Sequence, residues 1–225
     1  MPKLKLFVAP GSCARVPTIA LEEIGVPFET ELLSMASGQQ KSPEFLAVNP
    51  KGKVPVLVVD GVPLTENVAI LSWLHRIYPE AALLPATYDP FESAQQTADL
   101  AFFSGTVHPH LTRVAMPVKF IEDAELAFDI VRSKATTDMI PVMAMINARL
   151  ADRPWWYGEA WSIVDAYLFW VWWRLRSVNF APEAFPNIVD HAERIQKRPS
   201  VARAMAREAV NVEILKARGT YRAPA

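Results

Sequence analysis

The N-terminal part of the chain alternates between strand and helix patterns, and this order constrains the fold more than any other feature. Strands are expected at Leu4–Val8, Phe28–Leu33, Val54–Val59 and Val62–Thr65, and helices at Val16–Ile24 and Val68–Ile77. The strand–helix–strand start is typical of a parallel βαβ unit. Asp60-Gly61 between the last two strands indicates a hairpin, which adds antiparallel pairing. The sequence therefore predicts a four-stranded mixed sheet with helices on its faces.

The rest of the chain carries helical patterns only. We expect helices at Phe91–Val107, Ala124–Leu150, Ile163–Ser177, Ile188–Arg198 and Val201–Val210. Ser162 and Asp165 have the spacing of a capping box at the start of the third of these helices, a structural feature. The predicted organisation is an α/β domain at residues 1–82, a linker at 83–92 and an all-helical domain at 93–225.

Composition limits the functional classes. The 225 residues carry 23 basic and 24 acidic side chains, so no net field attracts nucleic acid or an anionic membrane. No apolar run approaches the ~20 residues that a membrane helix needs. Cys13 is the single cysteine and cannot form an intrachain disulfide. We expect a cytoplasmic protein without a signal peptide.

Three short motifs are candidates for chemistry, and the first is Pro10-Gly11-Ser12-Cys13, which lies between a strand and a helix. The N-terminus of a helix favours negative charge, so Cys13 is a candidate thiolate with a lowered pKa. Alternatively, Ser12 or Cys13 donates a hydrogen bond to the thiolate of a ligand. A third interpretation is a buried structural cysteine beside a serine N-cap. The position alone does not separate these three.

The second motif is Gly52-Lys53-Val54-Pro55, at the start of a predicted strand. A cis Val54–Pro55 bond, as in thioredoxin-like folds, would expose the backbone of Val54 to an extended peptide-like ligand. The alternative is an ordinary trans proline at a strand edge.

The third motif is Thr65-Glu66-Asn67, where the last strand meets a helix. The helix N-terminus would hold a carboxylate and Glu66 would accept from an ammonium, which together suit an α-amino acid head group. Simple capping by Thr65 or Asn67 explains the same residues.

His108 and His110 stand close together, which raises the question of a metal. The chain has four histidines, and no cysteine or acidic cluster accompanies these two, so we expect no metal site. A histidine at a helix end near a domain cleft is the preferred interpretation of His108.

Taken in order, these segments resemble the bacterial beta class of cytosolic glutathione transferases along nearly the whole chain. The matching segments are Pro10–Cys13, Ala20–Glu23, Ala47–Pro55, Leu64–Ile70, Val107-His108, Asp165–Phe169 and Arg198–Val201. The resemblance implies a thioredoxin-like domain, with a four-stranded sheet and three helices, followed by a helical bundle. It also implies glutathione as co-substrate and a homodimer.

The resemblance assigns a role to each site residue. Cys13, with Ser12 beside it, falls on the residue that faces the glutathione sulfur. Val54 and Pro55 match the cis-proline turn that pairs with the cysteinyl backbone. Glu66 and Asn67 match the γ-glutamyl site. Two further assignments are His108, on the active-site histidine of the class, and Lys41, near the position of a glutathione-binding lysine.

The sequence departs from the class at several of these places. Pro109 follows the histidine where a lysine is usual, and Ala101 stands where an asparagine reaches the glutathione of the partner subunit. Lys41 is slightly displaced. Asn67 replaces the usual serine, glycine or alanine, and Ser12 replaces a common alanine.

The resemblance implies that the glutathione thiolate attacks a hydrophobic electrophile held against the helical domain. Candidates for that apolar wall are Phe102, Phe103, Val107 and Met116. Conjugation, dehalogenation, ether cleavage, isomerisation and reduction would share this pattern. Two alternatives are thiol–disulfide reductase or peroxidase chemistry through Cys13 and a non-catalytic glutathione-transferase-like binding protein.

Overall fold

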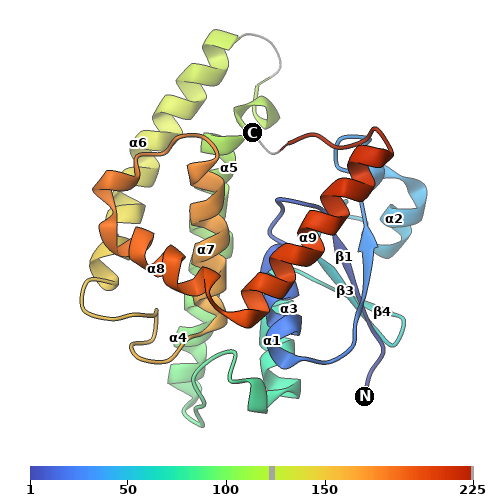
Figure 1. The fold of residues 1–225 in the computed structure, drawn as a ribbon, viewed down its shortest axis with the longest axis horizontal. Coiled ribbons are helices and arrows are strands. Elements are labelled where there is room, and N and C mark those ends of the chain that lie inside the picture. Colours follow the sequence, from blue (N-terminus) through green and yellow to red (C-terminus); the bar gives the residue numbers. More distant parts are fainter. Residues whose placement is uncertain (122–124, 224–225) are drawn as a thin grey trace. The chain divides into compact units, whose positions relative to one another are not determined.

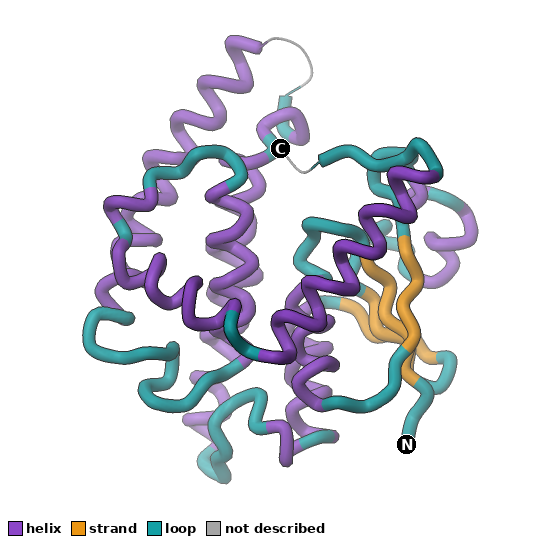
Figure 2. The backbone as a smooth tube through the Cα atoms, viewed as in Figure 1, coloured by secondary structure: helices purple, strands orange, loops and turns teal. Residues whose placement is uncertain are grey.

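In the computed structural model, which describes residues 1–121 and 125–223, the chain divides into two compact units. The sheet unit comprises Met1–Leu83 together with the C-terminal segment that starts at Lys197. The helical unit is Leu84–Gln196. Figure 2 shows the strands of the sheet unit in orange and the helices of both units in purple.

The sheet unit contains a four-stranded sheet in the order β2-β1-β3-β4. Its strands are β1 (Leu4–Val8), β2 (Glu29–Leu32), β3 (Val56–Val59) and β4 (Val62–Thr65). β1 and β2 are parallel, whereas β3 is antiparallel to both β1 and β4. The predicted mixed sheet is confirmed. β3 begins two residues later than expected, after Pro55, which has no N–H for the sheet.

Helices α1 (Arg15–Ile24), α2 (Pro43–Val48), α3 (Asn67–Ile77) and α9 (Pro199–Ala217) complete this unit. α1 ends as predicted at Gly25, whose left-handed backbone lets its N–H reach the carbonyl of Leu21. The sequence patterns predict an irregular segment where α2 lies, because α2 is too short to show a helical periodicity. Its local signal is Ser42, whose side chain accepts from the N–H of Phe45, followed by a proline at the first helical position.

The two faces of the sheet are built by alternation along β1. Leu4, Leu6 and Val8 are buried on one face, and Phe7 points to the other. Phe7 packs against Phe45 of α2, with ring centroids 5.4 Å apart. In Figure 1, α9 (red) runs alongside α1 (blue).

α9 is longer than the predicted Val201–Val210, and it belongs to the sheet unit by its contacts. Buried Glu22 of α1 accepts from the Nε of Arg203 at 2.7 Å and also pairs with Arg207. Such ion pairs join residues far apart in sequence, which a periodicity pattern does not reveal. The domain limits at residues 82 and 93 stay a prediction.

The helical unit consists of α4 (Pro90–Ala101), a π-helical segment (Phe102–Val107), α5 (His108–Ala115), α6 (Glu125–Arg149), α7 (Ile163–Arg176) and α8 (Pro186–Gln196), with short 3₁₀ turns. The α6, α7 and α8 bounds agree with the predicted helices to within a few residues, apart from Ala124, which lies outside the described residues. None of the helices in residues 1–121 and 125–223 is long and apolar enough to cross a membrane.

The predicted end of a helix at Val107 is wrong, because helical backbone continues into α5. The turn before α5 is not a regular α-helical turn, because Pro109 lacks an N–H and its ring would clash with the preceding turn of an α-helix. The wider π turn avoids that clash, with the N–H of His108 donating to the carbonyl of Phe103. His108 therefore lies within a continuous helical run rather than at its end.

Candidate functional site

Three segments of the sheet unit meet at one end of the sheet because of the strand register. Val56 pairs with Thr65, and Phe7 pairs with Val56. The end of β1, the start of β3 and the end of β4 therefore lie side by side. The loop before α1, the segment 51–55 and the junction of β4 with α3 extend from these three strand ends. These are the three motifs that the sequence singles out.

The Cys13 thiol points toward the second motif. Its Sγ lies 3.7 Å from the backbone carbonyl oxygen of Val54, within donating distance for a thiol. Cys13 precedes the first turn of α1, and its own carbonyl accepts from the N–H of Val16 at 3.2 Å. The thiol thus lies between the N-terminus of α1 and the Val54 backbone.

Ser12 is oriented differently. Its hydroxyl donates to the carbonyl of Ala9 at 2.6 Å and accepts from the N–H of Ala14 at 3.3 Å. The single hydroxyl proton therefore closes the turn that precedes α1. Of the two neighbouring candidates, Cys13 is the one whose side chain faces the Val54 segment.

The Val54–Pro55 peptide bond is cis, as the thioredoxin-like interpretation expects. Just before it, Gly52 has a φ of +63°, and a Cβ there would lie 2.8 Å from the carbonyl oxygen of Gln40. Only glycine fits this position without a backbone shift. The ammonium of Lys41 lies 3.1 Å from the same point, so Lys41 belongs to the rim of this segment.

Gly52→Ala is expected to displace the segment that carries Val54, whereas Gly38→Ala is a matched control. Gly38 has a φ of +75° with open space around its Cβ position, so its substitution adds only left-handed strain of about 1–2 kcal/mol. Gly52→Ala adds the clash as well, and we expect it to lower the free energy of unfolding by at least ~1 kcal/mol more. Denaturant titration of both variants measures the difference, and equal losses would contradict the close approach.

The third motif contains a strained residue. Glu66 has a φ of 72° and a ψ of 128°, a conformation that is rare for a residue with a side chain. Its carboxylate is exposed and pairs with the ammonium of Lys51 at 2.6 Å, while the same ammonium lies 3.0 Å from the Thr65 hydroxyl. Strain of this kind accumulates at binding sites.

The sequence analysis did not identify Lys51 as a site residue. The strand register could have identified it, because Lys51 precedes β3, Glu66 follows β4, and these two strands are antiparallel neighbours. The pair places a cation and an anion together on the surface. Exposed pairs contribute only about 0–1 kcal/mol, so a ligand with both charges can open this one at little cost.

Asn67 joins the third motif to the first. Its side-chain amide donates to the carbonyl of Cys13 at 3.3 Å, and the residue is buried. A serine at this position would not reach so far. The side chain therefore links α3 to the Cys13 loop, while the backbone at the start of α3 remains the natural place for a carboxylate.

The structure brings together Cys13, Val54 and Asn67, with Lys41, Lys51 and Glu66 around them. His108 lies in the helical unit, where its ring contacts Trp170 edge-on at a centroid distance of 4.6 Å. Among residues 1–121 and 125–223, no three His, Cys, Asp or Glu side chains are grouped to hold a metal ion.

Two of the four residues expected to form an apolar substrate wall are buried. Phe103 and Val107 have no exposed surface, and Phe103 packs against Trp156 and Tyr167. They are core residues of the helical unit, because the π turn rotates that side of the helix inward. Phe102 and Met116 are partly exposed.

Comparison with known proteins finds two family models on this chain. Residues 2–76 match the model of the glutathione S-transferase N-terminal domain, and residues 129–205 match a model of its C-terminal domain. Glutathione S-transferase GstA of Escherichia coli O157:H7 is 30% identical over 207 residues, which cover 91% of this chain and 98% of that protein.

Solved structures with the same fold include two from sphingomonads. A bacterial beta class glutathione S-transferase of Sphingomonas chungbukensis has a TM-score of 0.79 and 32% identity, covering 91% of this chain and 98% of that chain. A sphingomonad glutathione S-transferase complexed with glutathione has a TM-score of 0.80 and 30% identity, covering 92% and 99%.

Two relatives with other activities in their names also match. A maleylacetoacetate isomerase of Pseudomonas aeruginosa is 26% identical, and the disulfide-bond oxidoreductase YfcG of Escherichia coli is 27% identical. Each match covers 90% of this chain and 94% of the relative. The family models, the relatives over their full length and the site at the end of the sheet agree: this chain belongs to the glutathione S-transferase family.

Proposed function

We propose that the protein is a glutathione transferase that conjugates the thiolate of glutathione to hydrophobic electrophiles. The observation that carries the proposal is the convergence of the Cys13 thiol, the Val54 backbone and the Lys51–Glu66 pair at one end of the sheet. These groups supply, in order, partners for a sulfur, for a peptide backbone and for a zwitterionic head group. Glutathione carries all three.

The proposed pose follows from these partners. The cysteinyl backbone of glutathione pairs with Val54, after the cis Pro55. The α-ammonium of its γ-glutamyl group is accepted by Glu66, and the α-carboxylate lies against Lys51 and the N-terminus of α3. Lys41, beside Gly52, is the cation for the glycine carboxylate.

In the proposed reaction, Cys13 donates a hydrogen bond to the glutathione sulfur. The thiol of glutathione has a pKa near ~8.5 in water, and a hydrogen bond to its charged form lowers that pKa. The sulfur loses its proton to solvent and attacks the electrophile, forming the thioether bond as the leaving group departs. By resemblance to the family, His108 is a second polar group at the site, and Phe102 and Met116 contact the electrophile.

Paired variants and glutathione analogues test the head-group assignment. Glu66→Gln is expected to weaken glutathione binding about tenfold, because a charge-assisted hydrogen bond to the ammonium is lost. For a glutathione analogue without the α-amino group, the affinity of this variant should equal that of the original protein. Lys51→Met should show the converse pattern with an analogue that lacks the α-carboxyl group. Calorimetry gives the affinities.

The control for charge is Lys3→Met, since Lys3 is an exposed lysine paired with Glu29 on the β2 side of the sheet. Its affinity should be unchanged. Glu66→Gln could instead weaken the binding of glutathione and of the deaminated analogue equally. That result would contradict the assignment of Glu66 to the ammonium group.

A second candidate function is glutathione-dependent disulfide reduction through Cys13, favoured by the helix N-terminus beside the thiol and by the relative YfcG. Here the Cys13 thiolate attacks a disulfide and releases one thiolate. A glutathione thiolate then attacks the mixed disulfide, releases Cys13 and becomes oxidised. Because Cys13 is the single cysteine, the resolving thiol comes from glutathione.

We further propose a homodimer in the cytoplasm, as the family resemblance implies. Light scattering on the purified protein should give twice the chain mass of 25.1 kDa. A monomer mass at micromolar concentration would contradict the dimer.

A further inference from the structure

We propose that Glu208 of α9 is a positioning residue that holds the Cys13 loop from the C-terminal part of the chain. The inference rests on the proposed function in one respect, the role of Cys13 at the reacting sulfur. The hydrogen bonds of the Glu208 carboxylate go to the loop before α1 and to the start of α1. It acts through the two residues that bracket Cys13 in the sequence, Gly11 and Arg15.

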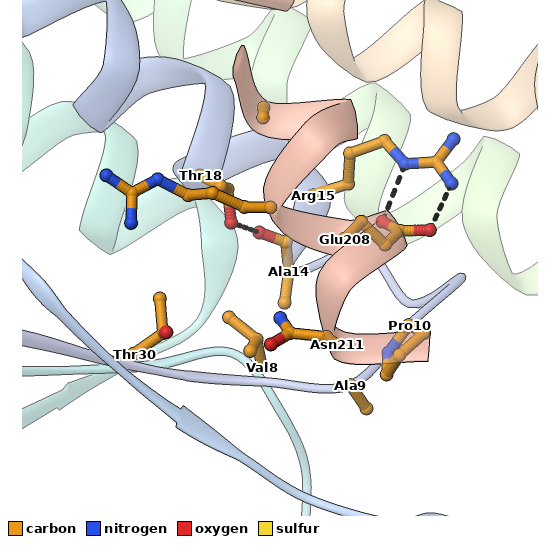
Figure 3. Close-up of a pocket in the computed structure, with 11 residues that line it drawn as sticks. Val8, Ala9, Pro10, Ala14, Arg15, Thr18, Thr30, Glu208 and Asn211 are labelled. Carbon is orange, nitrogen blue, oxygen red and sulfur yellow. Dashed lines mark hydrogen bonds and ion pairs between the residues drawn. The ribbon is translucent and has the colours of Figure 1, made fainter. Parts of the chain in front are cut away.

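Both oxygens of the Glu208 carboxylate are used. Oε1 accepts from the backbone N–H of Gly11 at 3.1 Å and from Nη2 of Arg15 at 2.6 Å. Oε2 accepts from Nε of Arg15 at 3.0 Å. Figure 3 shows the two parallel contacts between the guanidinium and the carboxylate. The Arg15 side chain is 1% exposed and that of Glu208 is 16% exposed, so solvent screens the pair weakly.

The loop also has contacts within itself and with the Val54 and Asn67 segments. The N–H of Ser12 donates to the carbonyl of Ala9 at 3.1 Å, and the Ser12 hydroxyl joins Ala9 to Ala14. Gly11 has a φ of +73°, which turns its N–H toward α9. Glu208 fixes the residue two before Cys13 and the residue two after it with one rigid group. The Cys13 side chain is thereby held in its direction toward Val54.

The surroundings of Glu208 indicate a structural contact rather than a ligand site. The cavity beside it has a volume of ≈ 20 Å³ and is lined by Arg15, Thr18, Thr30 and Asn211, among others. That volume holds about one water molecule. Figure 3 shows Asn211 and Thr30 among the residues that line the cavity. A substrate therefore does not compete for the carboxylate.

A second ion pair between the same two helices provides a matched control. Glu22 lies near the other end of α1, is 7% exposed, and accepts from Arg203 and Arg207 of α9. It anchors α9 to α1 as Glu208 does. However, it lies nine residues beyond Cys13 in the sequence, and its carboxylate pairs with arginines of α9 rather than with the residues on either side of Cys13. Glu22→Gln and Glu208→Gln thus make the same chemical change to a largely buried carboxylate between the same helices.

The test uses the fact that Cys13 is the single cysteine, so alkylation by iodoacetamide reports on this one thiol. We expect Glu208→Gln to change the alkylation rate several-fold, toward faster reaction, because the thiol is no longer held at Val54. In glutathione conjugation, kcat should fall roughly 10–100-fold while KM for glutathione changes much less. Glu22→Gln should lower the Tm and leave the alkylation rate and kcat as they were.

Equal alkylation rates and equal kcat in Glu208→Gln and Glu22→Gln, both folded at the assay temperature, would overturn the proposal. If Glu208→Gln loses too much stability for kinetics, hydrogen exchange at the Gly11 amide decides. Exchange should be faster than in the original protein for Glu208→Gln and unchanged for Glu22→Gln. Alkylation and exchange need no glutathione, so failure of glutathione binding would refute the proposed function without deciding the role of Glu208.

Discussion

Asp165→Ala is expected to lower the free energy of unfolding by about 3–5 kcal/mol, the largest effect of any substitution considered. Asp165 is fully buried at the start of α7. One oxygen accepts from the N–H of Trp156 at 2.7 Å and contacts Nε2 of His191 at 2.9 Å. The other accepts from the N–H and the hydroxyl of Ser162 at 2.8 and 2.9 Å. Alanine would leave these buried donors without a partner.

Asp138→Ala is the control for this prediction. Asp138 is an acid of α6 in the same unit, but its side chain is 38% exposed and its ion pair with Lys134 is a single helical i,i+4 contact. Its loss should cost about 0.3–0.5 kcal/mol. Urea unfolding followed by tryptophan fluorescence measures both variants. A loss of stability in Asp165→Ala no larger than in Asp138→Ala would contradict the central role of this carboxylate.

Cys13→Ala is expected to lower kcat for glutathione conjugation by roughly 10–100-fold, the value of one charge-assisted hydrogen bond to a thiolate. Cys13→Ser keeps a donor at nearly the same place and should retain most of the activity. The affinity for glutathione should change little in either variant, because Val54, Glu66 and Lys51 remain. Conjugation to 1-chloro-2,4-dinitrobenzene measures the rates.

The same two variants separate conjugation from disulfide chemistry. A mixed disulfide requires the Cys13 sulfur, so both Ser and Ala would abolish reduction of a glutathione mixed disulfide. If disulfide chemistry is the function, the intact mass of the original protein should show one added glutathione on Cys13. Full loss of turnover in Cys13→Ser, together with that added mass, would favour the reductase and contradict the conjugation mechanism.

The sequence predicted those elements that are determined by interactions between residues close together in the chain. The capping box of Ser162 and Asp165 is confirmed because both residues act within one helical turn. Gly25 ends α1 for the same reason. The four strands were predictable because alternation and the Asp60-Gly61 turn act over a few residues.

Features that depend on distant partners were not predictable from these patterns. The Cys13 thiol meets the Val54 carbonyl across 41 positions of sequence. Lys51 meets Glu66 only through strand register. Glu208 meets Gly11 across 197 positions of sequence, so no window of the chain contains both.

The π segment shows a third limit of prediction from the sequence. The helical pattern of Phe91–Val107 correctly predicts helical backbone, but Pro109 is compatible both with the end of a helix and with a changed hydrogen-bond pattern inside one. The buried Phe103 and Val107 follow from that change, since the extra residue in the turn alters which side chains face the core.

The most direct measurement is a calorimetric titration of the purified protein with reduced glutathione, repeated with Glu66→Gln. A saturable heat with a dissociation constant between micromolar and low millimolar, weakened in the variant, is the predicted result. No binding heat at several temperatures, together with no glutathione-dependent rise in Tm, would contradict a functional glutathione site in this chain.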